Sequence, residues 1–135
     1  MLNENAIAWL AALRSGEYKQ GRKALHDDRD KSSNFCCLGV ACDLYAKAGH
    51  GSWIKAPDGA ITYTFLAKNG HSSQDALPAP VTDWLGIRTG DGFFEPDTTP
   101  GNAQSLIDLN DNKSFTFLQI ADVIESQPKG LFNAE

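Results

Sequence analysis

The stretch from Asn34 to Gly49 most constrains the fold, because it holds all three cysteines and is built almost entirely of small or apolar residues. At 100° per residue, one helical side gathers Cys37, Val40, Ala41, Leu44 and Ala48. The opposite side gathers mostly small residues: Leu38, Gly39, Cys42 and Ala46. Only a narrow polar strip remains: Cys36, Asp43 and Lys47. We therefore predict a buried helix over residues 35–48, packed on both sides and ended by Gly49 in a left-handed conformation.

The length of 135 residues predicts one domain over residues 1–135. No stretch approaches the roughly 18 consecutive apolar residues of a membrane span, and the residues after Met1 lack the order of a signal peptide. Three cysteines are an odd number, so free thiols in a reducing compartment are the simplest interpretation. We expect a cytoplasmic protein without a membrane partner.

The formal charge of −5 and the isoelectric point near 5.1 work against binding to nucleic acid and favour a basic partner. Residues 105–126 could form two short helices joined by a tight turn, as in helix-turn-helix proteins. The outer face of the second helix would carry Asp122 and Glu125, which would repel phosphate. A DNA-binding regulator is therefore the function that the sequence supports least.

The N-terminal third predicts a helix, an extended segment and a loop. Asn3 can cap a helix over residues 4–14, with Ile7, Leu10, Ala11 and Arg14 on one face and Ser15-Gly16 at its end. Residues 17–25 are predicted as an extended segment with a turn at Gly21. Residues 26–33 are predicted as a charged, solvated loop, after which Ser33 or Asn34 caps the central helix.

The rest of the chain predicts a hairpin and three short helices. Residues 52–55 and 60–66 flank Pro57-Asp58-Gly59, a turn sequence. Pro80 opens a helix that ends before Gly86. Residues 88–101 are predicted as the least protected loop. A helix from Asn102 to Asp111 and one from Ser114 to Pro128 follow. The fold class is α+β: a single compact domain with four to five helices around the central helix and a small antiparallel sheet.

Cys36 is the first candidate for chemistry, because a thiol in the first turn of a helix faces free amides that favour its thiolate. A cysteine hydrolase would also need a base, for which His71 is the candidate, and an oxyanion donor, for which Gln20 is the candidate. The order Gln, Cys, His matches papain-like enzymes. His50 would lie about 20 Å from Cys36 along the helix axis. The opposing interpretation is that Cys36 is a small buried hydrophobe.

A metal site and a cofactor site are not predicted. Cys37 and Cys42 are five residues apart and diverge by about 140° on a helix. The sequence has no pair of cysteines or histidines at zinc-ligand spacing and no glycine-rich phosphate loop. We therefore expect neither a metal nor a cofactor.

Two polar pairs lie at the ends of apolar runs beside tight turns: Gln20-Gly21 and Asn110-Asp111. Their ordinary role would be to stabilise the turns. The alternative is that they converge with Cys36 and Asp43 on one concave binding site, to which Tyr18 would also belong.

The chain resembles a group of small phage and prophage proteins without an assigned function. The resemblance rests on four blocks: residues 13–21 with Tyr-Lys-Gln-Gly, residues 35–43 with Cys-Cys-Leu-Gly-Val, residues 77–86 with Leu-Pro and Trp-Leu-Gly, and residues 109–125 with Leu-Asn-Asp and Ile-Ala-Asp-Val-Ile-Glu. Ala41 departs from the larger aliphatic residue expected there. The resemblance implies a phage or prophage gene expressed in the bacterial cytoplasm.

Together these observations predict a small non-enzymatic phage or prophage accessory protein that binds a host protein or a small ligand and counters a host defence. The predicted binding residues are Tyr18, Gln20, Gly21, Cys36, Asp43, Asn110 and Asp111. The alternative is the hydrolase of Cys36, His71 and Gln20. The sequence leaves the oligomeric state open.

Overall fold

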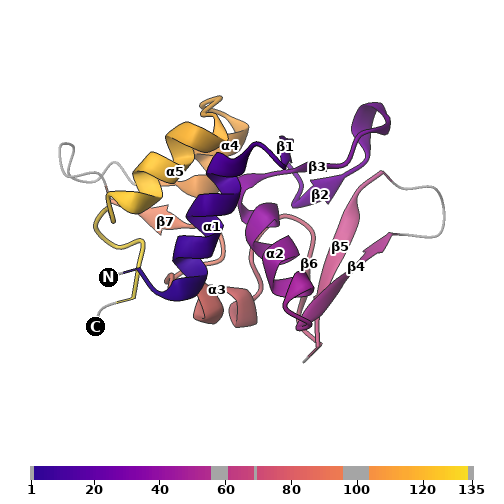
Figure 1. Cartoon of the computed structure of the whole chain (residues 1–135), viewed down its shortest axis with the longest axis horizontal. Helices are drawn as coiled ribbons and strands as arrows, with labels where there is room; N and C mark the ends of the chain where they lie inside the picture. The colour runs from indigo at the N-terminus through magenta and orange to yellow at the C-terminus, as the bar shows by residue number, and fades with distance from the viewer. Residues whose placement is uncertain (1, 56–60, 69, 96–103, 134–135) are drawn as a thin grey trace.

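A computed structural model describes residues 2–55, 61–68, 70–95 and 104–133. It is an α+β fold, as predicted (Figure 1). Five α-helices and one 3-10 helix lie in the described residues: α1 (Glu4–Ser15), η1 (Arg29–Lys31), α2 (Cys37–Lys47), α3 (Ala79–Leu85), α4 (Leu106–Asp111) and α5 (Phe117–Glu125). None of these helices is both long and apolar enough to cross a membrane.

The strands form three small sheets in the described residues. A mixed sheet has the order β1-β3-β2, where β1 (Lys19–Gln20) runs parallel and β2 (His26–Asp27) antiparallel to β3 (Asn34–Phe35). An antiparallel sheet joins β4 (Gly51–Lys55), β5 (Tyr63–Ala67) and β6 (Ser72–Ser73). The third pairs β7 (Phe93–Phe94) with β8 (Gln104–Ser105). The predicted hairpin is therefore present, and its turn lies outside the described residues.

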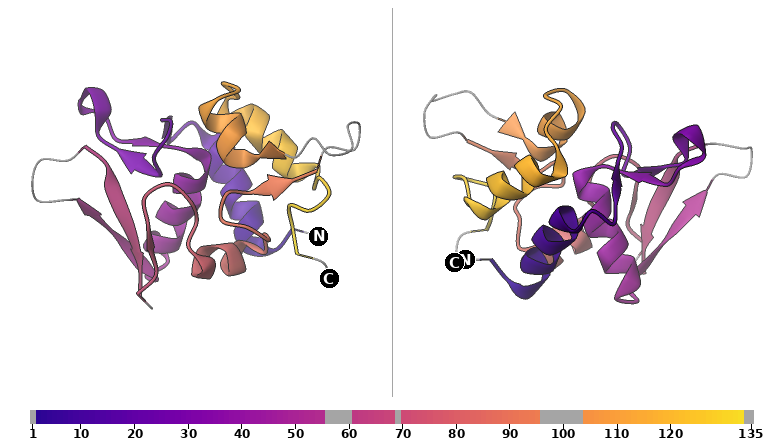
Figure 2. Two further views of the ribbon diagram at one scale, coloured as in Figure 1. Left: turned by 180° about the vertical axis from the view of Figure 1, so that it is seen from behind. Right: turned by 45° about the horizontal axis from the view of Figure 1, so that its top comes forward.

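Helix α2 lies at the centre of the molecule, between the α1–α5 pair and the β4–β5 hairpin (Figure 2). Its first six residues, 37–42, are all buried. Gly49 follows the helix with φ of 90°, the left-handed conformation that its sequence position predicts. The predicted cap is wrong: Cys36 is the N-cap residue, and Asn34 lies in β3, where its amide binds Asp27.

Helix α1 packs on α5, so elements from the two ends of the sequence lie side by side (Figure 1). Asn3 caps α1 through a bond from Ala6 N to Asn3 Oδ1 of 2.8 Å, as predicted. The predicted apolar face is only partly right. Ile7 is 55% exposed, and the buried residues of α1 are Ala6, Trp9, Leu10 and Leu13.

Helix α5 begins two residues later than predicted. Thr116, not Ser114, caps it, because the Thr116 hydroxyl accepts from Gln119 N while the Gln119 side chain accepts from Thr116 N. This reciprocal pair satisfies two free amides at once. Ser114 instead turns the chain with φ of 57°.

Residues 88–95 are a packed segment rather than the loose loop that their glycine content predicts. Phe94 is 4% exposed, and β7 is bonded to β8. Arg88 N and Glu95 N donate to carbonyls of Leu131 and Lys129, respectively. Residues 96–101 of the predicted loop lie outside the described residues.

Candidate functional site

Gln20 and Asn110 meet, although they lie 90 positions apart in the sequence. The Gln20 Nε2 atom donates to Asn110 Oδ1 at 2.9 Å and to the carbonyl of Phe115 at 2.8 Å. Its Oε1 atom accepts from Phe117 N at 3.2 Å. Strand β1 is thereby tied to α4 and to the start of α5.

Asn110 is fully buried and makes four side-chain hydrogen bonds. Its Oδ1 atom also accepts from Cys37 N, one of the free amides at the start of α2, at 3.2 Å. Its Nδ2 atom donates to the Gly21 carbonyl and to Asp111 Oδ1, both at 2.9 Å. The predicted convergence of Gln20, Gly21, Asn110 and Asp111 therefore occurs, but it forms an internal network. We call it the Gln20–Asn110 latch.

Cys36 does not have the environment of a nucleophile. Its side chain is buried, with 4% exposed, and its Sγ atom accepts a hydrogen bond from Gly39 N at 3.4 Å. The amides of α2 favour the thiolate, but burial outweighs them and raises the pKa of Cys36 to about 12. This environment favours the interpretation of Cys36 as a small buried hydrophobe over the alternative of an activated nucleophile. Burial also prevents Cys36 from touching a ligand directly.

The other two parts of the predicted hydrolase lie in separate settings. His71 is exposed beside β6, and its carbonyl accepts from Ala67 N at 2.8 Å. Both hydrogens of the Gln20 amide are already donated within the latch. Gln20 therefore has no donor left for an oxyanion, and the geometry disfavours this hydrolase.

Asp43 joins Tyr18 in a half-buried polar cluster. Its Oδ2 atom accepts from the Tyr18 hydroxyl at 2.6 Å and pairs with Lys47 Nζ at 3.4 Å, while its Oδ1 atom accepts from Trp53 Nε1 at 3.1 Å. Burial and the bond to Asp43 raise the pKa of Tyr18. The cluster holds Tyr18 between α2 and the β1-β3-β2 sheet. The rings of Tyr18 and Phe35 make an edge-to-face contact with 5.1 Å between their centroids.

His26 is a residue whose role the sequence did not reveal, since it was predicted to lie in a solvated loop. The imidazole is stacked between Phe35 at 4.1 Å and Tyr63 at 4.0 Å, and its Nε2 atom lies 2.6 Å from Ser33 Oγ. Asp27 is also buried, at 1% exposed. A run of charged residues has no apolar periodicity from which burial could be predicted. The burial of His26 and Asp27 becomes visible only once β2 is paired with β3.

The stability of the protein is expected to fall as the pH drops from about 7.5 to about 5. Burial lowers the pKa of His26, an effect that outweighs the nearby carboxylates of Asp28, Asp43 and Asp27. The Nδ1 atom of His26 is buried and has no partner in the described residues. The unfolded chain therefore binds a proton below its ordinary pKa of about 6.5 more readily than the folded chain does.

Urea unfolding at several pH values measures this effect. The His26→Phe variant keeps a ring between Phe35 and Tyr63 but cannot titrate, so its urea midpoint should vary less between these pH values. An equally steep pH dependence in His26→Phe would rule out His26 as its source.

A hollow of about 260 Å³ lies where the end of α1, strand β1 and the start of α5 meet. We call it the α1–α5 hollow, and these residues line it: Leu13, Arg14, Gly16, Tyr18, Gln20, Thr116, Phe117 and Leu118. Two of the predicted binding residues, Tyr18 and Gln20, are thus on its wall. Leu118 is 59% exposed and so places apolar surface at the edge of the hollow.

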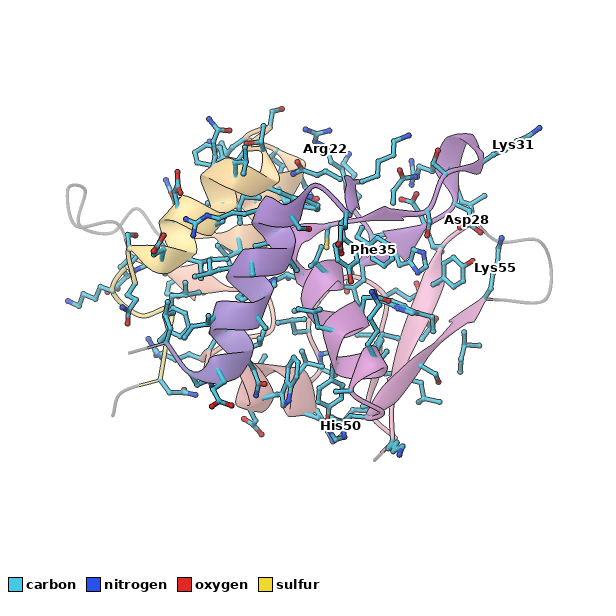
Figure 3. The ribbon with its side chains drawn as sticks, viewed as in Figure 1. Arg22, Asp28, Lys31, Phe35, His50 and Lys55 are labelled. Carbon is cyan, nitrogen blue, oxygen red and sulfur yellow. The ribbon has the colours of Figure 1, made fainter. Side chains whose placement is uncertain are left out.

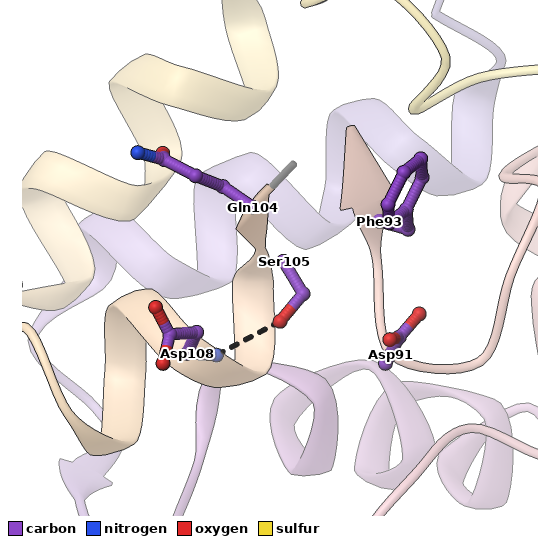
Figure 4. Close-up of a pocket in the computed structure, with 5 residues that line it drawn as sticks. All are labelled: Asp91, Phe93, Gln104, Ser105 and Asp108. Carbon is purple, nitrogen blue, oxygen red and sulfur yellow. Dashed lines mark hydrogen bonds between the residues drawn. The ribbon is translucent and has the colours of Figure 1, made fainter. Parts of the chain in front are cut away.

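A second hollow, of about 390 Å³, lies beside β7, β8 and α4 (Figure 4). Asp91, Phe93, Gln104, Ser105 and Asp108 line it. The Ser105 hydroxyl accepts from Asp108 N at 3.1 Å, and the Asp91 carboxylate accepts from Thr89 at 2.7 Å. The sequence did not indicate this hollow, because its walls come from segments that pair only in the fold.

In the described part of the chain, no group of three or more His, Cys, Asp or Glu residues could hold a metal ion. All three cysteines are free and buried. Binding within the described residues would therefore involve the surface and its hollows rather than the buried thiols.

A family model described as "Domain of unknown function (DUF8296)" matches residues 1–128. The chain belongs to the DUF8296 family. No curated protein and no solved structure matches the chain. The DUF8296 match extends from α1 through the end of α5, and so includes both the latch and the α1–α5 hollow.

Proposed function

We propose that this DUF8296 protein is a small non-enzymatic accessory protein of a phage or prophage, which binds a host protein in the bacterial cytoplasm and thereby counters a host defence. The phage setting rests on the sequence resemblance described above. The non-enzymatic part is supported by the buried thiol of Cys36 and by the fully used amide of Gln20.

The α1–α5 hollow is the observation that carries the proposal. Its volume of about 260 Å³ is below the roughly 300 to 1,000 Å³ usual for small-molecule pockets. A hollow of this size suits one large apolar side chain of a protein partner, the kind of anchor that dominates interface energies. Tyr18 and Phe117 supply aromatic walls, and Leu118 offers apolar area at the rim.

Charge beside the hollow favours a basic partner. Arg14 pairs with Asp122 at 2.7 Å and with Glu125 at 2.6 Å. One cation thus faces two carboxylates, and Asp122 and Glu125 remain 76% and 56% exposed. Glu17 is also exposed nearby in the sequence. Lysine or arginine residues around the anchor would complement these carboxylates.

The Leu118→Asp variant tests the hollow. We expect a tagged parent protein to retain a specific host protein from a bacterial lysate and Leu118→Asp to lose it, because the new charge would be desolvated in the interface. Ile7→Asp is the matched control, since Ile7 is an equally exposed apolar residue of α1, at 55%, outside the hollow. Equal retention by the parent and Leu118→Asp would contradict the proposal.

The thiols provide a separate test against hydrolysis. We expect iodoacetamide to alkylate the folded protein slowly at neutral pH, because the pKa of Cys36 is about 12 and its side chain is buried. Denaturant should expose all three thiols to rapid alkylation. His71→Ala should leave the folded rate unchanged. Rapid alkylation that depends on His71 would support the hydrolase instead.

A further inference from the structure

Residues 19–31 carry five of the twelve lysines and arginines of an otherwise acidic chain: Lys19, Arg22, Lys23, Arg29 and Lys31. All five side chains are exposed. Figure 3 places Arg22 and Lys31 on the same upper edge of the molecule, where both point away from its body. We call Lys19, Arg22, Lys23 and Lys31 the basic edge.

This segment has three carboxylates, of which Asp27 and Asp28 are engaged by other groups, while the side chain of Asp30 lies outside the described part of the chain. Asp27 is buried and accepts from Asn34 at 2.9 Å, with Arg29 at 3.4 Å, so Arg29 is left out of the basic edge. Asp28 accepts from Lys55 at 2.6 Å and from Tyr63 at 2.9 Å. No carboxylate that the structure describes forms an ion pair with a member of the basic edge.

The fold holds several of these cations in place. Arg22 Nε donates to the Asn110 carbonyl at 3.2 Å, and within the described residues no hydrogen bond engages its two terminal amino groups. Lys19 Nζ donates to Ser32 Oγ at 3.1 Å, so the two ends of the segment lie together. The edge is therefore attached to the sheet and, through Asn110, to the Gln20–Asn110 latch.

Lys23 and Lys31 adopt φ values of 67° and 59°, a left-handed conformation that glycine would adopt at lower cost. Asp111 Oδ1 accepts from Lys23 N at 2.8 Å and holds that backbone in place. Strained positions of this kind cluster at ligand-binding sites. Lysine at both positions keeps a cation where the backbone alone would favour glycine.

We infer that the basic edge binds the phosphate backbone of a nucleic acid. The large exposed apolar residues of the described chain are Ile7, Ile54, Ile61 and Leu118, and none lies in residues 19–31. Protein interfaces need an apolar centre, whereas phosphates are held by exposed cations alone. The expectation against nucleic acid rested on the net charge of the chain and on the acidic face of α5. The members of the basic edge lie on other elements: β1, η1 and the segment that follows β1.

Fluorescence anisotropy with labelled oligothymidylate at low salt tests the inference. The parent should bind, with an affinity that falls steeply as salt is added. Lys23→Gln/Lys31→Gln should weaken binding about tenfold and reduce the slope of log affinity against log salt by about 1.4, or 0.7 per lost phosphate contact. The control, Lys68→Gln/Lys129→Gln, removes the same charge from exposed lysines elsewhere and should leave the slope unchanged.

Three results would overturn the inference. The first is that the parent does not bind oligothymidylate at low salt. The second is an equal loss of affinity in both double variants, which would indicate net charge alone. The third is that polyglutamate competes as well as unlabelled oligothymidylate, which would indicate an acidic protein partner. Because Leu118 lies outside the basic edge, the Leu118→Asp test of the proposed function can fail or succeed independently.

Discussion

The Gly39→Ala variant is expected to lose about 3 kcal/mol or more of unfolding free energy. A Cβ atom at position 39 would lie 1.7 Å from the carbonyl oxygen of Leu25 and 2.6 Å from its carbonyl carbon. Both are backbone atoms, so no side-chain rotation can relieve the clash. Leu25 also accepts from Cys36 N at 3.3 Å, and a shift of its backbone would weaken that bond.

Gly49→Ala is the control for this prediction. Gly49 has φ of 90° but nothing within 4 Å of the added Cβ, so alanine there should cost only about 1 kcal/mol of backbone strain. Thermal melts of the parent and both variants measure the difference. If Gly39→Ala melted no lower than Gly49→Ala, α2 would not be as closely packed on Leu25 as the structure indicates.

The Asn110→Ala variant is expected to lose about 3 to 5 kcal/mol, because it removes one partner from each of four hydrogen bonds, one of them buried and three partly buried. Cys37 N and the Gly21 carbonyl would be left without their Asn110 partners. The Gln20 Nε2 atom would keep only its bond to the Phe115 carbonyl. Urea unfolding compares this variant with the parent.

Asn112→Ala is the matched control, because Asn112 is exposed and its amide donates to a single acceptor, Asp108 Oδ1. Its effect should stay below about 0.5 kcal/mol, as for most surface substitutions. Asn110→Asp keeps the acceptor oxygen but loses the donor to Gly21, so it should also destabilise strongly. Similar unfolding midpoints for Asn110→Ala and Asn112→Ala would mean that the latch contributes little.

The helices were predictable because their signals are local. The apolar spacing of α5 repeats at i, i+3, i+4 and i+7, and Phe117, Ile120, Ala121 and Ile124 are its buried residues. Asn3 and Gly16 begin and end α1 through contacts with near neighbours in the chain. The predicted caps at Ser114 and Asn34 were wrong because several adjacent polar residues could each fill the same role.

The site could be predicted only in part, because its contacts are distant in sequence. The sequence left open whether Gln20 and Asn110 stabilise separate turns or converge, and their residue types do not show whether their amides face a ligand or each other. His26 was placed in solvent, since the two rings that cover it come from β3 and β5. Burial of Cys36 likewise depends on packing around α2, which reverses the effect of the local amides on its thiol.

The contact of α1 with α5 has a consequence for synthesis on the ribosome. Helix α1 is synthesised before α5, yet part of the surface that covers α1 and the carboxylates that pair with Arg14 belong to α5. The face of α1 that packs on α5 therefore lacks this cover until α5 has been synthesised, and an isolated helix of 12 residues is marginal in water. The protein should reach its native state only after α5 leaves the exit tunnel, and a chain stalled before residue 117 should be held by chaperones or degraded.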